Sequence, residues 1–370
     1  MKALAVFPSR REVRIIDHAT PQVTGSRQVK VRVLEVGLCG TDREIAAFDY
    51  GTPPAGSDYL VLGHESLCQV VETGPEVRRL RPGDLAVLMV RRGCSHPECL
   101  ACPAGRPDFC YTGEFTERGI KGEHGFMTTF VVEDESHVVP VPPALREVGV
   151  LTEPLTIAQK ALAQVWEVQQ RLPWACHGAL EAGPGACHRA VVLGAGPVGL
   201  LGAMALVAAG FDTTVYSRGG EHSDKASLTE SFGARFVPAE SRSVDDLAAV
   251  TGNVDLVYEA TGASRVAFDM LRLLGPNAVF VFTGVPGRKA PIEVAADLIM
   301  RRLVLHNQVI LGTVNAPRQS YEDAIRDLGV FLDRWPGALR GLITLRVALD
   351  EGPRLLRERP AGIKTVVVPQ

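Results

Sequence analysis

The feature that most constrains the fold is a glycine-rich turn inside an uncharged run of 22 residues, Ala190–Phe211. A short apolar strand pattern precedes the turn and a helix pattern follows it. The turn has the form G-x-G-x-x-G, in which the first glycine permits a tight turn and the second lets the backbone approach a pyrophosphate. The third glycine allows close packing of helix on strand, and the start of the helix presents free N–H groups to the phosphates. The sequence therefore predicts a dinucleotide site that contains Gly194, Gly196, Pro197, Val198 and Gly199.

The same uncharged run also has to be weighed as a membrane span, because about 20 apolar residues suffice to cross a bilayer. Its glycines and Pro197 fall near its start, however, and leave only about a dozen residues for a helix. The N-terminal apolar segment is stopped by Pro8 and is too short for the core of a signal peptide. We therefore expect no membrane contact and a cytoplasmic location.

Downstream of the glycine-rich turn, strand patterns alternate with helical stretches. The strand patterns lie at Ala190–Leu193, Thr213–Tyr216, Val254–Tyr258 and Ala278–Thr283. Apolar strands that alternate with helices are typical of a doubly wound parallel sheet, the Rossmann fold. The first 150 residues are β-rich instead, and this character returns toward the C-terminus. The sequence predicts an α/β fold in which a Rossmann domain, residues 159–304, is inserted into a catalytic domain, residues 1–158 and 305–370.

The charge balance argues against a nucleic-acid partner. Lys and Arg total 39, Asp and Glu total 42, and the net charge is −3, so the chain lacks the basic surface that binding of nucleic-acid phosphates requires. Eight cysteines in 370 residues are also too few for a secreted disulfide scaffold. Four of them lie within 17 residues, and in a reducing compartment such clustering usually indicates a metal site.

The clustered cysteines are Cys94, Cys99, Cys102 and Cys110. Zinc binds four thiolates tetrahedrally, and sites closed in this way are structural. His96 lies between the first two cysteines and is an alternative ligand to Cys94. The sequence therefore predicts a structural zinc lobe. The cysteines outside both metal patterns are expected to be free thiols: Cys68, Cys176 and Cys187.

A second, dispersed set of metal-ligand types lies nearer the N-terminus. Cys39 follows a strand pattern, and His64 and Glu65 come 25 residues later. Thiolate, imidazole and carboxylate together suit a catalytic zinc that keeps one position open for water or substrate. The sequence therefore predicts a catalytic zinc in addition to the structural one.

The choice of cofactor is indicated at the end of the second Rossmann strand. An NAD site offers Asp or Glu there to the ribose hydroxyls, about 20 residues after the glycine-rich turn. This chain offers Ser217 and Arg218 and has no carboxylate before Glu221. A guanidinium pairs with a 2′-phosphate, which a carboxylate would repel. We therefore expect NADP as the preferred cofactor, with NAD as a second one.

In combination, these motifs resemble the zinc-dependent medium-chain dehydrogenase/reductase superfamily, and within it the glucose (aldose) 1-dehydrogenase branch. The resemblance covers essentially the whole chain. The further motifs that carry it are Gly37–Ala46 (GLCGTDREIA), Gly63–Glu65 (GHE), Gly105–Cys110 (GRPDFC), Glu117–Phe126 (ERGIKGEHGF), Glu153–Leu155 (EPL), Tyr258–Gly262 (YEATG), Thr283–Pro286 (TGVP) and Leu311–Asn315 (LGTVN). The resemblance implies a GroES-like fold for the catalytic domain.

The resemblance also implies roles at the metal. Cys39 and His64 would be zinc ligands, Glu65 would lie at or near the ion, and Glu153 would supply a further carboxylate. Thr41 corresponds to the family's hydroxyl in the proton relay. Glu44 stands where many alcohol dehydrogenases continue that relay with a histidine.

Further roles concern the substrate and the cofactor. By resemblance, the sugar hydroxyls would be contacted by Thr41, Glu114, Glu153 and Asn315. Gly284 and Val285 would line the nicotinamide, and Thr261 would lie on the adenosine side.

The activity implied is zinc-dependent, NAD(P)-linked oxidation of an aldose, glucose or galactose, at C1 to the aldonolactone. A zinc-dependent polyol or secondary-alcohol dehydrogenase is the nearest alternative. A metal-free quinone or enone reductase would need none of the metal ligands, and a zinc-ribbon module for nucleic acid would need a basic surface. Family likeness also suggests a homo-oligomer, a dimer or tetramer, with the strand around Val279–Thr283 as an edge.

Overall fold

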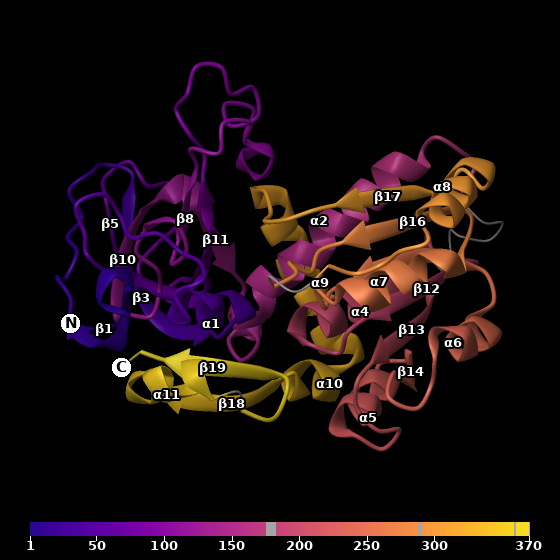
Figure 1. Cartoon of the computed structure of the whole chain (residues 1–370). Coiled ribbons are helices and arrows are strands. Elements are labelled where there is room, and N and C mark those ends of the chain that lie inside the picture. The colour runs from indigo at the N-terminus through magenta and orange to yellow at the C-terminus, as the bar shows by residue number, and fades with distance from the viewer. Residues whose placement is uncertain (175–182, 288–290, 359, 370) are drawn as a thin grey trace. The chain divides into compact units, whose positions relative to one another are not determined.

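The structure, a computed structural model, describes residues 1–174, 183–287, 291–358 and 360–369. The chain forms two compact units (Figure 1). Unit 1 consists of Met1–Thr156, Asn315–Leu332 and Leu342–Gln370, and unit 2 consists of Ile157–Val314 and Asp333–Gly341. The second unit therefore extends beyond residue 304, the end expected for the Rossmann domain, because one further strand belongs to its sheet.

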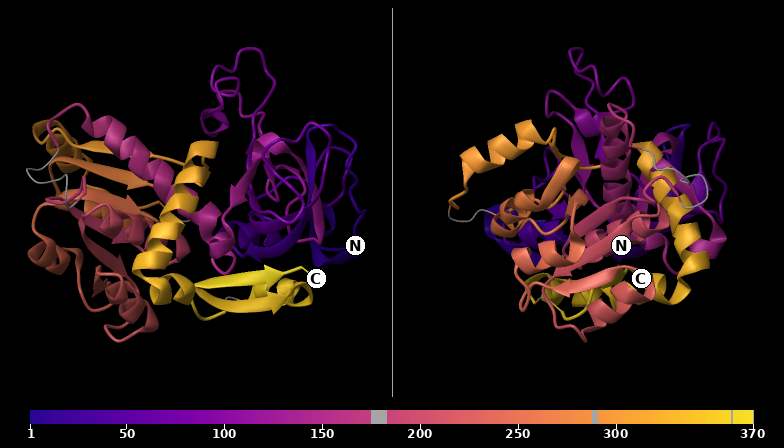
Figure 2. Two further views of the ribbon diagram at one scale, coloured as in Figure 1. Left: turned by 180° about the vertical axis from the view of Figure 1, so that it is seen from behind. Right: turned by 90° about the vertical axis from the view of Figure 1, so that its right-hand side faces the viewer.

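Unit 1 is built mainly from antiparallel strands. Its largest sheet has the order β11-β6-β5-β3-β19-β18, with β10 also paired to β3, and two three-stranded sheets, β2-β1-β4 and β7-β8-β9, complete it. The strands are β1 Lys2–Phe7, β2 Glu12–Asp17, β3 Gln28–Gly37, β4 Leu60–Val61, β5 Glu65–Thr73, β6 Leu85–Leu88, β7 Arg91–Arg92, β8 Thr116–Arg118, β9 Gly122–Glu123, β10 Phe130–Asp134, β11 Val138–Val141, β18 Ile343–Ala348 and β19 Lys364–Val368. Figure 2 shows the parallel pair β18 and β19 side by side as yellow arrows.

The helices that lie wholly within unit 1 are short. They are α1 Gly40–Ala46, η1 Pro8–Arg10, η2 Pro107–Phe109, η3 Glu135–His137, η4 Pro143–Leu145, η5 Gly149–Leu151, η7 Leu349–Glu351 and α11 Gly352–Arg357. Two longer helices, α2 Thr152–Gln169 and α9 Arg318–Arg334, each begin in unit 1 and end in unit 2.

Strand β3 is the centre of the unit 1 core. Its alternating pattern buries Val29, Val31 and Val33, which belong to one apolar cluster with side chains from β1, β5, β6 and α11. Residues two apart on a strand point to the same face, and the apolar side chains at alternate positions of β3 are accordingly the buried ones. The strand also pairs with β5, β10 and β19, and it therefore holds the N-terminal and C-terminal parts of unit 1 together.

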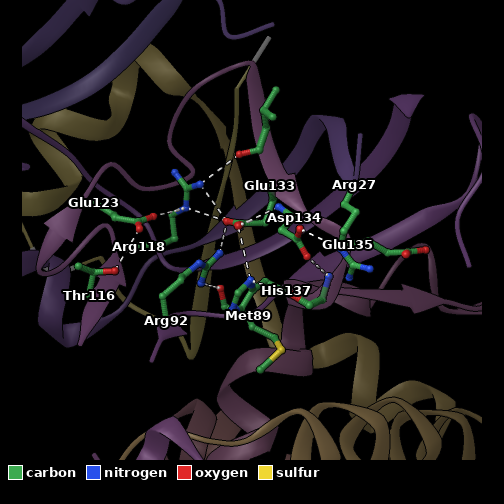
Figure 3. Close-up of polar contacts among 12 residues, drawn as sticks. Arg27, Met89, Arg92, Thr116, Arg118, Glu123, Glu133, Asp134, Glu135 and His137 are labelled. Carbon is green, nitrogen blue, oxygen red and sulfur yellow. Dashed lines mark hydrogen bonds and ion pairs between the residues drawn. The ribbon is translucent and has the colours of Figure 1, made fainter. Parts of the chain in front are cut away.

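A buried ion cluster ties the short strand β7 to this sheet. Figure 3 shows the guanidinium groups of Arg92 and Arg118 converging on the carboxylate of Glu133 in β10. Arg118 binds this carboxylate through Nη2 at 2.8 Å and through Nε at 3.1 Å, and Arg92 also reaches the carbonyl of Met89. Burial raises the pKa of Glu133, but the two guanidinium charges outweigh it and lower the pKa to about 2. The cluster fixes the base of the loop that carries the four clustered cysteines.

Unit 2 contains a six-stranded parallel sheet in the order β14-β13-β12-β15-β16-β17. This order is that of a dinucleotide-binding Rossmann fold. Its strands are β12 Arg189–Leu193, β13 Asp212–Ser217, β14 Arg235–Pro238, β15 Val254–Glu259, β16 Leu274–Phe282 and β17 Val309–Gly312. Its helices are α4 Pro197–Ala208, α5 Asp224–Ser231, α6 Val244–Thr251, α7 Ser264–Met270, η6 Leu271–Leu273, α8 Ala296–Leu305 and α10 Pro336–Gly341.

The α/β prediction, with a Rossmann sheet and a separate β-rich unit, is confirmed. One topological expectation is wrong: the strand around Val279–Thr283 is not an edge, because β16 lies between β15 and β17. The edge on that side of the sheet is β17, a four-residue strand that the sequence did not reveal, and β14 forms the other edge. The uncharged run becomes β12, the turn and the 12-residue helix α4, and none of the described helices is long and apolar enough to cross a membrane.

The cysteines outside the metal patterns also differ from expectation. Cys68 is a buried free thiol, as expected. Cys187 forms a disulfide bond, so the prediction of a free thiol there is wrong; the number and spacing of cysteines do not show which thiols meet in space. Cys176 lies outside the described residues.

We predict that Glu133→Gln lowers the free energy of unfolding at pH 7 by about 3 kcal/mol, which is what a pKa lowered from 4.5 to about 2 corresponds to. Because the folded-state pKa is the lower one, this stabilisation is present above about pH 4.5 and is lost as the pH falls toward 2. Urea unfolding at several pH values measures it.

The matched control is Glu12→Gln, which removes an exposed pair with Arg14 at 3.2 Å and should change the unfolding free energy by less than about 0.5 kcal/mol. Equal effects of the two substitutions, or an effect of Glu133→Gln that does not shrink in acid, would contradict the prediction.

Candidate metal and cofactor sites

The four clustered cysteines come together in the loop between β7 and β8, which Figure 1 shows projecting from unit 1. The Sγ–Sγ distances are 3.7 Å for Cys94–Cys102, 3.6 Å for Cys94–Cys110 and 3.9 Å for Cys99–Cys110. Four sulfurs arranged tetrahedrally about 2.3 Å from a zinc ion are about 3.8 Å apart. The four thiols therefore fit a structural zinc ion. His96 is not one of this group, and its Nδ1 accepts a hydrogen bond from the Glu98 backbone.

The lobe is anchored at its base by Arg91, a buried residue of β7. Its Nη1 donates to the carbonyls of Pro107 and Asp108 at 3.3 and 3.4 Å. Its Nε and Nη2 donate to the carboxylate of Glu117 at 3.0 and 2.9 Å. Arg91 thus joins the end of the cysteine loop to β8. The hydrogen bonds of Arg91 therefore hold the ends of this loop in place in addition to any metal bound by its thiols.

The dispersed metal pattern also comes together. Cys39, His64 and Glu65 each offer one ligand atom, and these three atoms lie within 4.8 Å of one another. Cys39 lies between β3 and α1, and Glu65 opens β5 at the point where its register pairs it with Gly37. His64 and Glu65 are almost fully buried, at 4% and 1% exposure. Thiolate, imidazole and carboxylate are a donor set that fits a catalytic zinc ion.

Asp42, on the first turn of α1, organises this group and was not identified from the sequence. It is fully buried. One carboxylate oxygen accepts a hydrogen bond from the backbone N–H of Cys39 at 2.8 Å, and the other accepts one from Gly63 at 3.2 Å and lies 3.5 Å from His64 Nδ1. Burial lowers the pKa of His64, but the Asp42 charge outweighs it and raises the pKa well above its usual value. A carboxylate on a ligating histidine is the usual second partner in zinc sites.

Lys364 is a second residue that the sequence did not reveal. It is fully buried at the start of β19, and its Nζ contacts the Glu65 carboxylate and donates to the carbonyl of Leu38 at 3.1 Å. A Cβ at position 37 would overlap Glu65 Oε2 and come within 2.7 Å of Lys364 Cε. Gly37 is therefore required because a lysine and a glutamate fill the space above its backbone.

Glu153 and Thr41 lie in the same region of unit 1. Glu153 stands in the first turn of α2 and is partly buried. Burial raises the pKa of its carboxyl to about 7, with the Glu65 charge adding to this effect and the His64 charge opposing it. Glu153 is not one of the three residues whose ligand atoms meet within 4.8 Å, so its ligand role remains a proposal. The Thr41 hydroxyl lies 3.9 Å from Cys39 Sγ.

The two residues expected to contact sugar hydroxyls have different environments. Glu114 is exposed, and its backbone N–H donates to Thr112 Oγ1 at 3.2 Å. Asn315 is buried; its Nδ2 donates to Glu117 at 3.0 Å, and its Oδ1 accepts from the Ala316 N–H at 2.8 Å. The Asn315 amide therefore retains one N–H for a ligand.

The glycine-rich turn has the geometry expected of a pyrophosphate cradle. Gly194 has a φ of +103°, which favours glycine, and Gly196 caps the start of α4 ahead of Pro197 and Val198. A Cβ at Gly199 would overlap the Gly194 carbonyl, whereas one at Gly196 would meet nothing within 4 Å. Position 199 thus needs glycine for packing, and position 196 faces open space where a phosphate can approach.

The residues expected to select NADP follow β13. Ser217 Oγ accepts a hydrogen bond from the Ala195 N–H at 3.0 Å, which leaves its own proton free to donate. Arg218 is exposed. The hydroxyl therefore links the end of β13 to the glycine-rich turn, and a guanidinium follows it in the chain.

Glu259, at the end of β15, organises the other two cofactor turns and was missed as a functional residue. It is buried at 1% exposure. Its Oε1 accepts hydrogen bonds from the Thr261 and Gly262 N–H groups at 2.6 and 2.9 Å, and its Oε2 accepts one from Gly284 at 3.2 Å. Val285 follows and is 70% exposed. One carboxylate thus holds together the two segments expected to meet the cofactor.

Comparison with known families and proteins agrees with this arrangement. Residues 25–143 match the alcohol dehydrogenase GroES-like domain, and residues 146–368 match the glucose dehydrogenase C-terminus. The chain is 37% identical over 368 residues to glucose 1-dehydrogenase of Methanocella arvoryzae, covering 99% of each chain. It is also 37% identical over 370 residues to the enzyme of Metallosphaera sedula, covering 99% of this chain and 98% of the other.

Among solved structures, glucose dehydrogenase of Haloferax mediterranei in complex with NADP, Zn and gluconolactone is 32% identical, with a TM-score of 0.87 and coverage of 100% of this chain and 99% of the other. These likenesses extend over both units. The chain therefore belongs to the glucose dehydrogenase branch of the zinc-dependent medium-chain dehydrogenase/reductase superfamily.

Proposed function

We propose that this protein is a zinc-dependent aldose 1-dehydrogenase that oxidises glucose or galactose at C1 to the aldonolactone and prefers NADP to NAD. The observation that carries the proposal is the convergence of Cys39, His64 and Glu65 ligand atoms within 4.8 Å in unit 1. The relatives named glucose 1-dehydrogenase, and the neighbour that holds NADP, Zn and gluconolactone, support the same substrate class.

A zinc ion held by Cys39, His64 and Glu65, with Glu153 as a further ligand, would supply Lewis-acid chemistry that lowers the pKa of the C1 hydroxyl. The Thr41 hydroxyl would take up the proton of that C1 hydroxyl while its own proton passes to solvent water, so that the threonine stays neutral. Glu44 stands three positions further along α1, so the two side chains share one face of the helix, and Glu44 is exposed to solvent. Asp42 and Lys364 hold His64 and Glu65 in place, and NADP, when bound, would supply the acceptor for the hydride of C1.

The test is a panel of aldoses and polyols with both cofactors, together with zinc analysis of the purified protein. We expect sugar-dependent NADPH formation and two zinc ions per chain, one for each ligand group. Oxidation of sorbitol but of no aldose would reject the proposal in favour of a polyol dehydrogenase, and activity without zinc would reject a metal-dependent reaction.

Two cysteine variants separate the metal sites. Cys39→Ser should lose one zinc ion and the activity, because it removes a ligand of the proposed catalytic site. Cys102→Ser should also lose one zinc ion, but with a lower Tm and a retained catalytic zinc, because closed thiolate sites contribute to folding. Loss of both ions from either variant would contradict two independent sites.

For the cofactor, we predict that Arg218→Ala lowers kcat/KM with NADP by about 10-fold or more and changes kcat/KM with NAD by less than about 2-fold. A charge-assisted hydrogen bond to the 2′-phosphate contributes about 1.5–3 kcal/mol, and NAD lacks that phosphate. Steady-state kinetics with both cofactors measure the ratio. A wild-type enzyme that prefers NAD would contradict the assignment of Arg218 to the 2′-phosphate.

The chain assembles as a homo-oligomer, a dimer or tetramer, through the β17 edge of the sheet in unit 2. Strand β17 pairs only with β16 among the described strands, so its outer backbone groups can take a further strand. Helix α8, which precedes it along the chain, exposes Leu298, Met300, Val304 and Leu305, at 51 to 75% exposure. Light scattering should give a multiple of 39.7 kDa, and Val304→Asp should shift the population toward monomer; a monomeric wild type at micromolar concentration would reject this proposal.

A further inference from the structure

A pocket of about 430 Å³ lies in unit 1, and none of the metal-ligand candidates lines it. Its lining residues are Tyr50, Gly51, Thr52, Phe115, Ile120 and Lys121. The volume falls within the range of small-molecule sites, about 300–1,000 Å³. The proposed function as stated above assigns no role to any of these six residues.

Backbone hydrogen bonds between two segments hold the pocket in shape. Thr52 forms a parallel bridge with Lys121. The Thr52 N–H donates to the Ile120 carbonyl at 2.9 Å, and the Gly122 N–H donates to the Thr52 carbonyl at 2.8 Å. Gly51 has a φ of +90° and packs against Ile45 of α1. The pocket is therefore preformed, and it lies against the helix that carries Thr41 and Glu44.

The Lys121 ammonium has an N–H donor available for a ligand. Its Nζ donates to the carbonyl of Gly113 and lies 4.2 Å from the centre of the Phe115 ring. No carboxylate of the residues that the structure describes forms an ion pair with it. Because an ammonium has three N–H donors, one remains for an oxygen in the pocket. Tyr50 and Thr52, whose side chains carry hydroxyls, line the same pocket, and Tyr50 is 53% exposed.

The pocket adjoins Glu114 and connects to Asn315, the two residues outside the metal site that the resemblance assigns to sugar hydroxyls. Glu114 lies between Gly113, whose carbonyl holds Lys121, and Phe115, which forms a wall. The centre of the Phe115 ring in turn lies 3.7 Å from the guanidinium of Arg91. Arg91 donates to Glu117, the residue that also binds the Asn315 amide. The pocket wall, Glu114 and Asn315 are therefore parts of one connected group.

We propose that this pocket binds the C6 end of an aldohexose and that Lys121 determines specificity by donating a hydrogen bond to the C6 hydroxyl. The inference rests on the proposed oxidation at C1. The lining residues include none of Cys39, His64 and Glu65, so the part of the sugar that enters the pocket is the part remote from C1. A hexose oxygen suits an ammonium without a carboxylate partner, and the ring of Phe115 and the side chain of Ile120 suit the C6 methylene.

The test compares D-glucose with D-xylose, which has the same ring configuration and lacks only the C6 hydroxymethyl group. Lys121→Met should lower kcat/KM for glucose by about 10-fold or more, mainly through KM, and should change kcat/KM for xylose by less than about 2-fold. Lys121→Arg, which keeps a charged donor, should restore part of the preference for glucose.

The matched control is Lys30→Met, because Lys30, on β3, also lies over an aromatic ring, that of Phe130 at 5.4 Å, but is not among the residues that line the pocket. It should leave both sugars unchanged, and the Tm of each variant separates binding from folding. An equal loss on both sugars, or no loss on either, would overturn the assignment of Lys121 while the oxidation of glucose by the wild type stands. A wild type that oxidises no aldose would instead reject the proposed function, and this inference with it.

Discussion

Much of unit 1 depends on the hydrogen bonds of one buried carboxylate, that of Asp42. Its two oxygens accept from the backbone of Cys39 and of Gly63, two positions that are distant in the sequence. A carboxylate without such donors would not be stable in the interior, and backbone N–H groups without an acceptor would be costly there as well. The same bonds therefore stabilise Asp42 and set the separation of Cys39 and His64. The hydrogen bonds from these backbone N–H groups to Asp42 therefore position the metal ligands before any ion is bound.

The same device recurs at the other functional segments. Glu259 binds three backbone N–H groups and holds Thr261, Gly262 and Gly284 together at the ends of two neighbouring strands. Glu117 links the base of the cysteine lobe, through Arg91, to Asn315. In each case a buried carboxylate accepts hydrogen bonds from the protein itself and thereby holds loop segments in place. Hydrogen bonds to a buried carboxylate thus fix the position of loops whose backbone groups do not pair within a β-sheet.

The sequence was informative where local pattern determines structure. The four cysteines and the glycine-rich turn each depend on spacing within one segment; the structure brings the four thiols together and places the turn between a strand and a helix. Asp42, Glu259 and Lys364 were missed because their partners are distant in sequence or are backbone groups, which leave no residue-type signal. Strand β17 was missed because it is four residues long and only half-buried. Asn315 was identified through resemblance, but its bond to Glu117 could not have been foreseen from either motif alone.

The charges around Cys39 explain why this site favours a divalent cation. Asp42, Glu65 and Glu153 contribute three carboxyl groups, Cys39 contributes a thiol, and Lys364 is the buried ammonium that faces them. Lys364 and the His64 imidazole are the positive groups that face this set, and burial together with the Glu65 charge still raises the pKa of Glu153 to about 7. A divalent ion would supply the missing positive charge at the point where the donor atoms converge. Lys364 acts separately on Glu65, because its ammonium contacts that buried carboxylate directly and so holds it in position as a ligand.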